Sequence, residues 1–256
     1  MPILPDTLNT AADAFAENRT AMLAQLAAHD AEVTKVVAGG GPTYVERHRK
    51  RGKLLARERI EAILDPASPF LELSPLAAWS SAFPAGAAMV TGIGVIEGVE
   101  CVVVANDPTV RGGASNPFTM KKQIRAMEIA SENRLPLVSL VESGGADLPS
   151  QSDIFIPGGK SFRDITALSA KGIPTLAVVF GNSTAGGAYT PGMSDYIVMI
   201  KERSKVFLGG PPLVKMATGE ESDDESLGGA EMHARVSGLA DHFALDELDG
   251  IRLGRQ

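Results

Sequence analysis

Short apolar runs alternate with amphipathic stretches along most of this chain. An apolar run of about five residues bounded by turn residues is typical of a buried strand, whereas helical spacing of apolar residues indicates a helix. We therefore expect helices over residues 11–37, 117–133 and 162–170. We expect strands over residues 70–73, 88–96, 100–105, 137–141, 175–180, 197–200 and 206–208, with a hairpin turn at Glu97-Gly98.

Beyond residue 105 the predicted strands and helices alternate. Asn116 precedes Pro117, which is the order expected of a helix cap and the first helical position. Alternation of this kind predicts parallel βαβ units in an α/β fold. In such sheets ligands lie at the carboxyl ends of the strands.

Two glycine-rich turns follow successive predicted strands. Gly144-Gly145-Ala146 follows the strand at 137–141, and Ala185-Gly186-Gly187 follows the strand at 175–180. Paired glycines allow positive φ and let a ligand approach the main chain closely. If both turns lie on one edge of the sheet, their backbone N–H groups can converge and stabilise an anion that forms during a reaction.

Composition and charge narrow the class of protein. An apolar fraction of 44% and a charged fraction of 21% are those of a globular protein, and the net charge of −7 disfavours nucleic-acid binding. The single cysteine, Cys101, excludes an internal disulfide, and its apolar neighbours predict a buried, unreactive thiol. Residues 1–6 lack signal-peptide features and no segment is apolar enough for a membrane span, so we expect a soluble cytoplasmic protein without membrane contact.

Other chemistries have weaker support. The four histidines lack the spacing of a ligand set, so we expect no metal site. Residues 181–185 (GNSTA) resemble the nucleophile elbow G-x-S-x-G but end in alanine. Ser183 is thus either a turn hydroxyl or a hydrolase nucleophile served by a distant His233 or His242. Neither a P-loop motif nor an ordered dinucleotide motif is present.

A basic stretch covers residues 46–60, with seven of the 24 Lys and Arg residues. Leu54, Leu55 and Ile60 give it an apolar side as well. Charge alone leaves two interpretations open, a solvated helix face and a phosphate-binding surface.

Six motifs resemble the β (carboxyltransferase) subunit of biotin-dependent acyl-CoA carboxylases, in that family's order, between about residues 44 and 244. They are RGKLLARERI (51–60), VANDPTVRGG (104–113), RLPLVSLVESGGADLP (134–149), STAGGAYTPGMSD (183–195), FLGGPPLVKMATGE (207–220) and LGGAEMHARVSGLADHFA (227–244). VANDPTV and ESGGADLP, with the lysine pair at 121–122, are more similar to the methylcrotonoyl-CoA branch than to the propionyl-CoA branch, in which Ala-Arg-Ile usually follows the glycine pair.

The resemblance implies a crotonase-like (ClpP/crotonase) ββα superhelix, an α/β fold, over residues 43–256, after a helical arm over residues 1–42. Residues 43–256 are then the N-terminal, acyl-CoA-binding domain of a carboxyltransferase. The resemblance implies a catalytic oxyanion site made of Gly144, Gly145, Ala146, Gly186 and Gly187. The residues implied to bind coenzyme A are Gly112, Gly113, Lys121, Ser143 and Ala185.

Family members transfer a carboxyl group from N-carboxybiotin to the carbon acidified by the acyl-CoA thioester. In the usual account the biotin, once decarboxylated, itself removes the substrate proton, which agrees with the lack of a convincing general base or metal site here. The resemblance thus implies biotin on a partner carrier domain and a coenzyme A thioester substrate.

Family subunits are about twice as long, and their second crotonase-like half holds the biotin. This sequence lacks that C-terminal biotin-side domain, so we expect either one part of a longer protein or one piece of a split enzyme. The implied partners are a biotin carboxylase or biotin carboxyl carrier subunit and the C-terminal half of another subunit, in a homo-oligomer. Alone, the chain is expected to bind coenzyme A weakly and to turn nothing over. A crotonase-like serine hydrolase using Ser183 and a non-catalytic CoA-binding module are the alternatives.

Overall fold

The computed structural model describes residues 8–256, and the chain divides into two compact units between Ala38 and Gly39. The first unit contains one long helix, α1 (Asp13–Val37), none of whose side chains is buried. It confirms the helix predicted over residues 11–37, while the arm boundary at residue 42 stays a prediction. Residues 1–6, from which a signal peptide was excluded, lie outside the described residues. Within residues 8–256, no helix is both long and apolar enough to cross a membrane.

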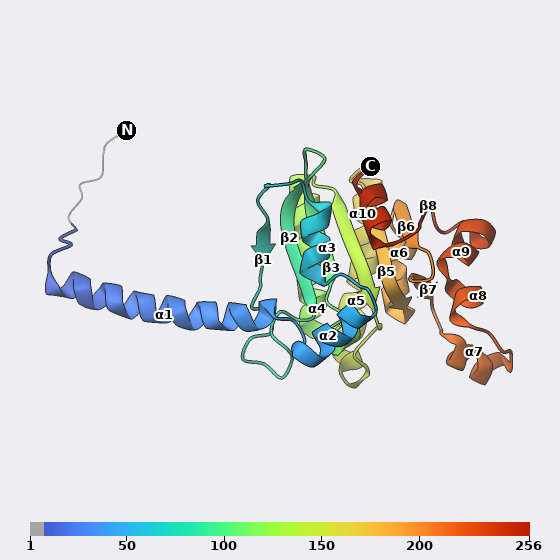
Figure 1. Ribbon diagram of the computed structural model, residues 1–256, viewed down its shortest axis with the longest axis horizontal. Helices are drawn as coiled ribbons and strands as arrows, with labels where there is room; N and C mark the ends of the chain where they lie inside the picture. Colours follow the sequence, from blue (N-terminus) through green and yellow to red (C-terminus); the bar gives the residue numbers. More distant parts are fainter. Residues whose placement is uncertain (1–7) are drawn as a thin grey trace. The chain divides into compact units, whose positions relative to one another are not determined.

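The second unit is built on an eight-stranded sheet with the order β1-β2-β3-β4-β5-β6-β8, with β7 paired to β5 (Figure 1). β1, β2 and β3 pair antiparallel, and every other pair is parallel, as the alternation of strands and helices predicted. The strands are β1 (Leu71–Leu73), β2 (Met89–Ile96), β3 (Val99–Asn106), β4 (Leu137–Ser143), β5 (Thr175–Thr184), β6 (Tyr196–Ile200), β7 (Lys205–Phe207) and β8 (His242–Ala244).

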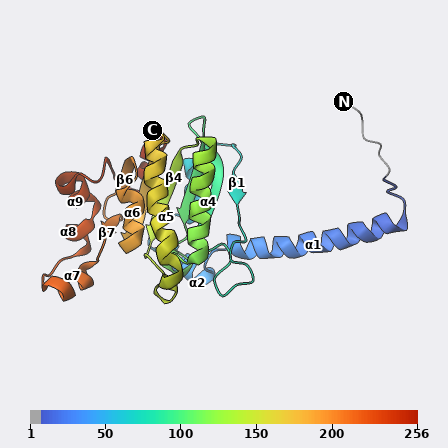
Figure 2. The ribbon, with the colours of Figure 1, turned by 180° about the vertical axis from the view of Figure 1, so that it is seen from behind.

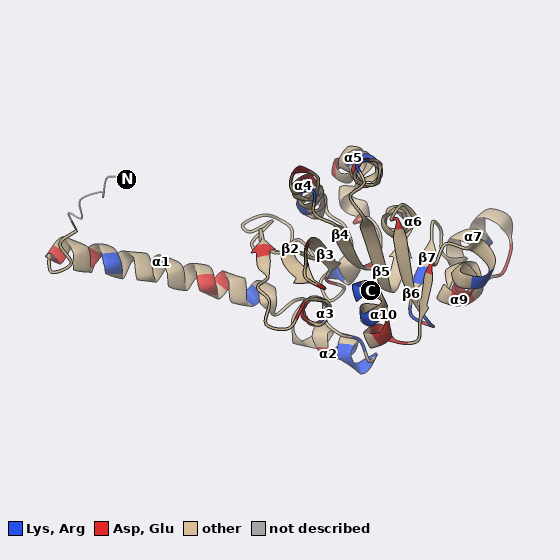
Figure 3. Cartoon of the chain, turned by 90° about the horizontal axis from the view of Figure 1, so that it is seen from above, with Lys and Arg blue, Asp and Glu red and all other residues tan. Residues whose placement is uncertain are grey.

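Helices cover both faces of this sheet, which lies as a middle layer in Figure 3. One face carries α2 (Pro42–Lys50), α3 (Ala56–Ile63) and α10 (Glu247–Arg255). The opposite face, nearer the viewer in Figure 2, carries α4 (Pro117–Asn133), α5 (Gln151–Ala170) and α6 (Tyr189–Gly192). The remaining helices are α7 (Pro211–Thr218), α8 (Asp224–Gly228) and α9 (Ala230–Met232), and the short helical turns are η1 (Arg111–Gly113), η2 (Leu148–Ser150), η3 (Ala185–Ala188) and η4 (His233–Ser237).

Local sequence signals account for two well-defined boundaries. The predicted hairpin turn joins β2 and β3, with Glu97 and Gly98 both at positive φ and both amides donating to the Asp65 carboxylate. The predicted cap of α4 is also present, because the Asn116 side chain accepts from the Phe118 and Thr119 amides and Pro117 opens the helix.

Three predicted boundaries were wrong. Helix α5 begins at Gln151 and not near residue 162, and it continues through Pro157, Gly158 and Gly159. Strands β4 and β5 continue to Ser143 and Thr184, past the apolar runs that predicted them, since parallel pairing extends to Ser143 and Ser183. The short strand β8 was not predicted; it pairs with β6 at the edge of the sheet.

Alternating side chains of β4 belong to different parts of the core. Val138 and Leu140 pack in the cluster that contains Ile60 of α3 and Ile251 of α10. Leu137 packs instead with residues of α4 and α5. The period of two in a strand thus gives β4 two faces, and the two faces end in different environments at Ser143.

Candidate active site

The two glycine turns lie side by side at the carboxyl ends of β4 and β5. Val141 pairs with Val179, but the next paired positions are Ser143 and Ser183, so one residue of β4 faces three residues of β5. This bulge brings the turn after β4 and the turn after β5 to the same level. The expectation that both turns share one edge of the sheet is therefore confirmed.

The first turn leaves one amide free. The Gly144 amide donates to the Gly112 carbonyl at 3.0 Å, and the Gly145 amide donates to the Ser143 hydroxyl at 3.2 Å. Within the described residues the Ala146 amide donates to nothing. Its neighbours hold the backbone in place, because the Gly145 carbonyl accepts from the Ser115 amide and the Asp147 amide donates to the Ser115 carbonyl. Of the three predicted donors in this turn, Ala146 is the one that can reach a ligand.

Gly145 must be glycine. Its φ is +91°, and a Cβ atom there would lie 3.1 Å from the Thr184 carbonyl oxygen of the second turn. A side chain would therefore strain the backbone and also push the two turns apart.

The second turn forms the short helix η3. Gly186 lies in the first turn of η3, where amides lack an acceptor within the helix. Gly186 and Gly187 both line a cavity between the sheet and helices α4 and α5. Ala185 is exposed, with φ +53°, and does not line the cavity.

The remaining predicted site residues have other surroundings. Gly112 and Gly113 do not line the cavity but hold the first turn, since their carbonyls accept from the Gly144 amide and the Ser143 hydroxyl. Ser143 is buried and lines the cavity, but its hydroxyl is occupied by these internal hydrogen bonds. Lys121 is exposed, lies over the Phe118 ring, and is not brought to the cavity.

The geometry is wrong for a serine hydrolase. The Ser183 side chain is fully buried, and its hydroxyl donates to the Gly187 carbonyl at 2.9 Å. The ring nitrogens of His233 bond the Val206 carbonyl and the Ser237 hydroxyl, so this histidine does not serve Ser183. Of the two interpretations of Ser183, a turn hydroxyl and a nucleophile, the structure supports the turn hydroxyl.

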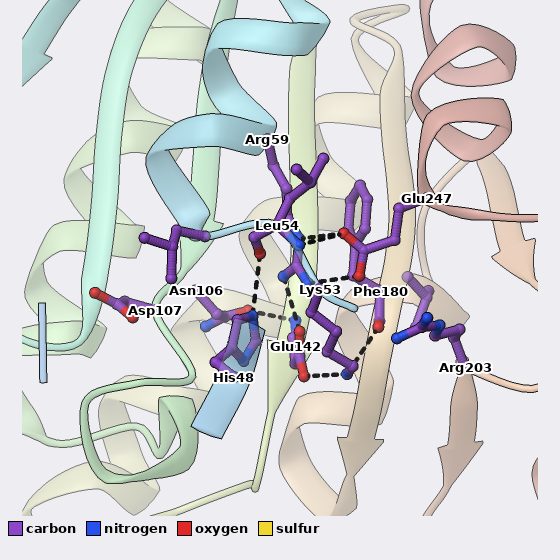
Figure 4. A network of polar contacts seen from close by, with 12 residues as sticks. His48, Lys53, Leu54, Arg59, Asn106, Asp107, Glu142, Phe180, Arg203 and Glu247 are labelled. Carbon is purple, nitrogen blue, oxygen red and sulfur yellow. Dashed lines mark hydrogen bonds and ion pairs between the residues drawn. The ribbon is translucent and has the colours of Figure 1, made fainter. Parts of the chain in front are cut away.

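A buried ionic cluster lies behind the turns, on the α3 side of the sheet (Figure 4). The Glu142 carboxylate contacts Lys53 Nζ at 2.5 Å and Arg59 at 2.8 Å, and Arg59 also pairs with Glu247 at 3.0 Å. The Arg59 guanidinium lies 4.3 Å from the centre of the Phe180 ring. Only 1% of the Arg59 side chain is exposed. These two cations therefore have a structural role and form neither a solvated face nor a phosphate-binding surface.

The cluster fills the bulge between β4 and β5. Besides binding Glu142, Lys53 Nζ donates to the Phe180 carbonyl at 3.2 Å, at the point where the strand pairing is interrupted. A Cβ atom on Gly181 would lie 2.6 Å from the Glu142 carboxylate, so this position also requires glycine. Burial tends to raise the pKa of Glu142, but Arg59 and Lys53 outweigh it and hold that pKa below its ordinary value. The ion pairs of Glu142 thus hold β4 to residues of α3 and of β5 at the bulge and stabilise the register that aligns the two turns.

On the opposite face of the sheet, α4, α5 and the two turns enclose a cavity of about 620 Å³. Most residues that line this cavity were not predicted from the sequence; they are apolar side chains of the sheet, α4 and α5. The signal was present in the helical spacing of Ile154, Gly158, Ser161 and Ile165, all of which line the cavity. Gly145, Ala146, Gly186 and Gly187 close the cavity at the carboxyl ends of the strands.

Two further expectations concern reactive and metal-binding groups. Cys101 is buried, as expected, and burial raises the pKa of its thiol to about 11. Among residues 8–256, His, Cys, Asp and Glu side chains nowhere form a group of three that could hold a metal ion.

Comparison with known proteins identifies the class to which this fold and site belong. Residues 47–256 match the carboxyl transferase domain family, and the chain is therefore a member of that family. It spans about half the length of the curated relatives it matches.

Three relatives illustrate the match. The chain is 69% identical, over 99% of its length and 48% of the relative's, to a probable biotin-dependent acyl-coenzyme A carboxylase beta2 subunit of Mycobacterium tuberculosis. It is 50% identical to the mitochondrial methylcrotonoyl-CoA carboxylase beta chain of Arabidopsis thaliana, over 99% of this chain and 44% of that one. The β subunit of P. aeruginosa geranyl-CoA carboxylase superposes with a TM-score of 0.93 at 45% identity, covering 99% of this chain and 48% of that one. The resemblance and the crotonase-like fold are thus confirmed.

Proposed function

We propose that this chain is the acyl-CoA-binding half of a carboxyltransferase, and that backbone amides stabilise the enolate of its substrate. Membership of the carboxyl transferase family supports the reaction class, and the names of the relatives support an acyl-CoA substrate. The observation that carries the proposal is the unpaired Ala146 amide, which lines the same end of an apolar cavity as Gly186 and Gly187 of η3.

In this proposal the thioester oxygen accepts hydrogen bonds from the Ala146 amide and from Gly186 in η3. Loss of the proton from the carbon that the thioester acidifies converts the carbonyl oxygen into an enolate oxygen, and fixed donors stabilise that new charge. The enolate electron pair then forms the carbon–carbon bond to the incoming carboxyl group, and the thioester carbonyl is restored. Carboxybiotin on a partner carrier would supply that carboxyl group when its N–C bond breaks, and the biotin nitrogen set free would accept the substrate proton.

The coenzyme A contacts proposed for Gly112, Gly113, Lys121, Ser143 and Ala185 belong to the same hypothesis. The hydroxyl of Ser143 is occupied, so its contact with coenzyme A would have to be apolar or through the main chain.

The chain spans about half the length of the relatives that it matches, so the partners of the whole enzyme are part of the proposal. We propose that a C-terminal half from another subunit completes the active site, in a homo-oligomer that works with a biotin carboxylase or a biotin carrier subunit. A cytoplasmic location is part of the same proposal.

The test is carboxylation in a reconstituted system. The chain is combined with the C-terminal half of a family subunit, a biotinylated carrier, its carboxylase, ATP and labelled bicarbonate, and a series of acyl-CoA thioesters including 3-methylcrotonoyl-CoA is supplied. We expect label in an acyl-CoA product only when both halves are present. Absence of product from every thioester, with both halves folded and associated, would overturn the proposal.

A further inference from the structure

The cavity beside the turns is long as well as large. It is lined by Leu137 at the start of β4, by Ser139 and Val141 along the strand, and by Ser143 at its end. Six residues of strand at about 3.3 Å each give a length of about 20 Å. The cavity therefore runs from the two turns along the whole of β4, under α5.

The walls of the cavity suit an uncharged, apolar occupant. None of the described side chains that line it is charged, and the end remote from the turns contains Leu137, Met127 and Ile165. Uncharged polar side chains such as Ser139 and Ser161 also line it, and the Ala146 amide and η3 lie at the end formed by the turns. Coenzyme A phosphates would therefore stay outside, whereas a thioester at the turns could send an apolar tail inward.

The volume of the cavity indicates how long an apolar tail it can hold. An apolar cavity of about 150 Å³ holds a benzene ring, so a five-carbon acyl group would leave most of this space empty. The cavity of about 620 Å³ has the size of a site for a much larger ligand. Because apolar atoms left without neighbours lose their packing contacts, a longer chain fills this site with a gain in affinity.

We propose that the cavity binds the acyl chain of a thioester with about ten to sixteen carbons, a range that its length and volume allow. The thioester lies at Ala146 and Gly186, and the tail extends along β4 past Gly158 towards Ile165. This inference rests on the proposed function and names the substrate class of the same site.

Gly158 offers the means of testing this arrangement. It lies on the stripe of α5 that faces the sheet, between the buried residues Ile154 and Ser161, and a Cβ atom built there contacts nothing within 4 Å. Gly158→Phe would thus place a ring across the path of the tail while improving the helix propensity of the position. Thr166→Phe adds the same ring to an exposed position of α5 that does not line the cavity.

The experiment is titration calorimetry of the chain with acetyl-, octanoyl-, dodecanoyl- and palmitoyl-CoA, each below its micelle concentration, and with free coenzyme A. We expect dodecanoyl-CoA to bind at least about tenfold more tightly than acetyl-CoA, a modest share of what burial of that many methylenes can yield. In Gly158→Phe this ratio should fall towards one, and in Thr166→Phe it should remain. Thermal unfolding of both variants checks their fold, and Gly159→Leu is a second obstruction in the same wall.

The outcomes separate the two proposals. Affinity that does not depend on chain length, together with binding of acetyl-CoA, overturns the long-chain inference and leaves the carboxyltransferase proposal standing. A ratio that Gly158→Phe and Gly159→Leu leave unchanged also overturns the inference, because the tail must then lie elsewhere. If neither coenzyme A nor any thioester binds, both proposals fail.

Discussion

The two faces of β4 differ in what they do with polar groups. On the α3 face, Glu142 is buried and ion-paired to Lys53 and Arg59. On the α5 face, one residue further along, Ser143 leads into a turn whose Ala146 amide has no partner within the described part of the chain. The first face satisfies its charges within the protein and so fixes the backbone; the second leaves a donor and an apolar cavity for a ligand. A rigid face behind the turns is what allows the other face to present an unpaired donor in a fixed direction.

The largest effect should follow from breaking the ionic face. Arg59→Met removes a partner of both Glu142 and Glu247; it leaves Glu142 with Lys53 alone and the buried Glu247 carboxylate with no cation among the described residues. We expect a loss of about 3–5 kcal/mol in the free energy of unfolding, measured by urea denaturation. Arg57→Met is the matched control, since Arg57 pairs with Glu72 nearer the surface and its loss should cost about 0–1 kcal/mol. Equal losses in the two variants would show that the cluster does not support the fold.

A smaller pair of opposite effects should distinguish neighbouring positions of β4. Ser139 lines the cavity and its hydroxyl makes no hydrogen bond within the described residues, so Ser139→Val should raise the free energy of unfolding by about 0.5–2 kcal/mol by filling space. The same substitution should weaken acyl-CoA binding. Val138, on the other face, is packed among Ile60 and Leu140, so Val138→Ile should instead lower stability by about 1–3 kcal/mol. Chemical denaturation measures the free energy of unfolding of both variants. If the two substitutions change it in the same direction, the distinction between the two faces of β4 is contradicted.

The sequence predicted the parts of this site that depend on local pattern. The apolar runs before Gly144 and Ala185 indicated neighbouring strands, and the parallel arrangement then required both turns to share an edge. The cap at Asn116 and the hairpin at Glu97-Gly98 are local for the same reason.

What the sequence did not predict depends on contacts between distant residues. Lys53 and Arg59 meet Glu142, and Arg59 meets Glu247, only after folding, so the charge pattern of residues 46–60 could not distinguish buried pairs from an exposed face. Which amides already have an acceptor is another such property, because the Gly144 amide donates to the carbonyl of Gly112, a residue that the turn motif does not contain. The cavity was not predicted because the expected helix began only at residue 162, whereas Ile154, Gly158 and Ser161 of α5 form part of the wall.

The most direct test of the central claim is the rate of the assembled carboxyltransferase with Ala146→Pro. Proline removes the free N–H at this position and breaks none of the hydrogen bonds that hold the turn, which use the Gly145 carbonyl and the Asp147 amide. Ala146→Ser keeps the N–H and serves as the control for the fold. The account predicts that kcat falls by about 10²–10³ in Ala146→Pro while KM for the acyl-CoA changes little, because the donor acts on charge that develops during the reaction. A kcat in Ala146→Pro equal to that of Ala146→Ser would contradict it.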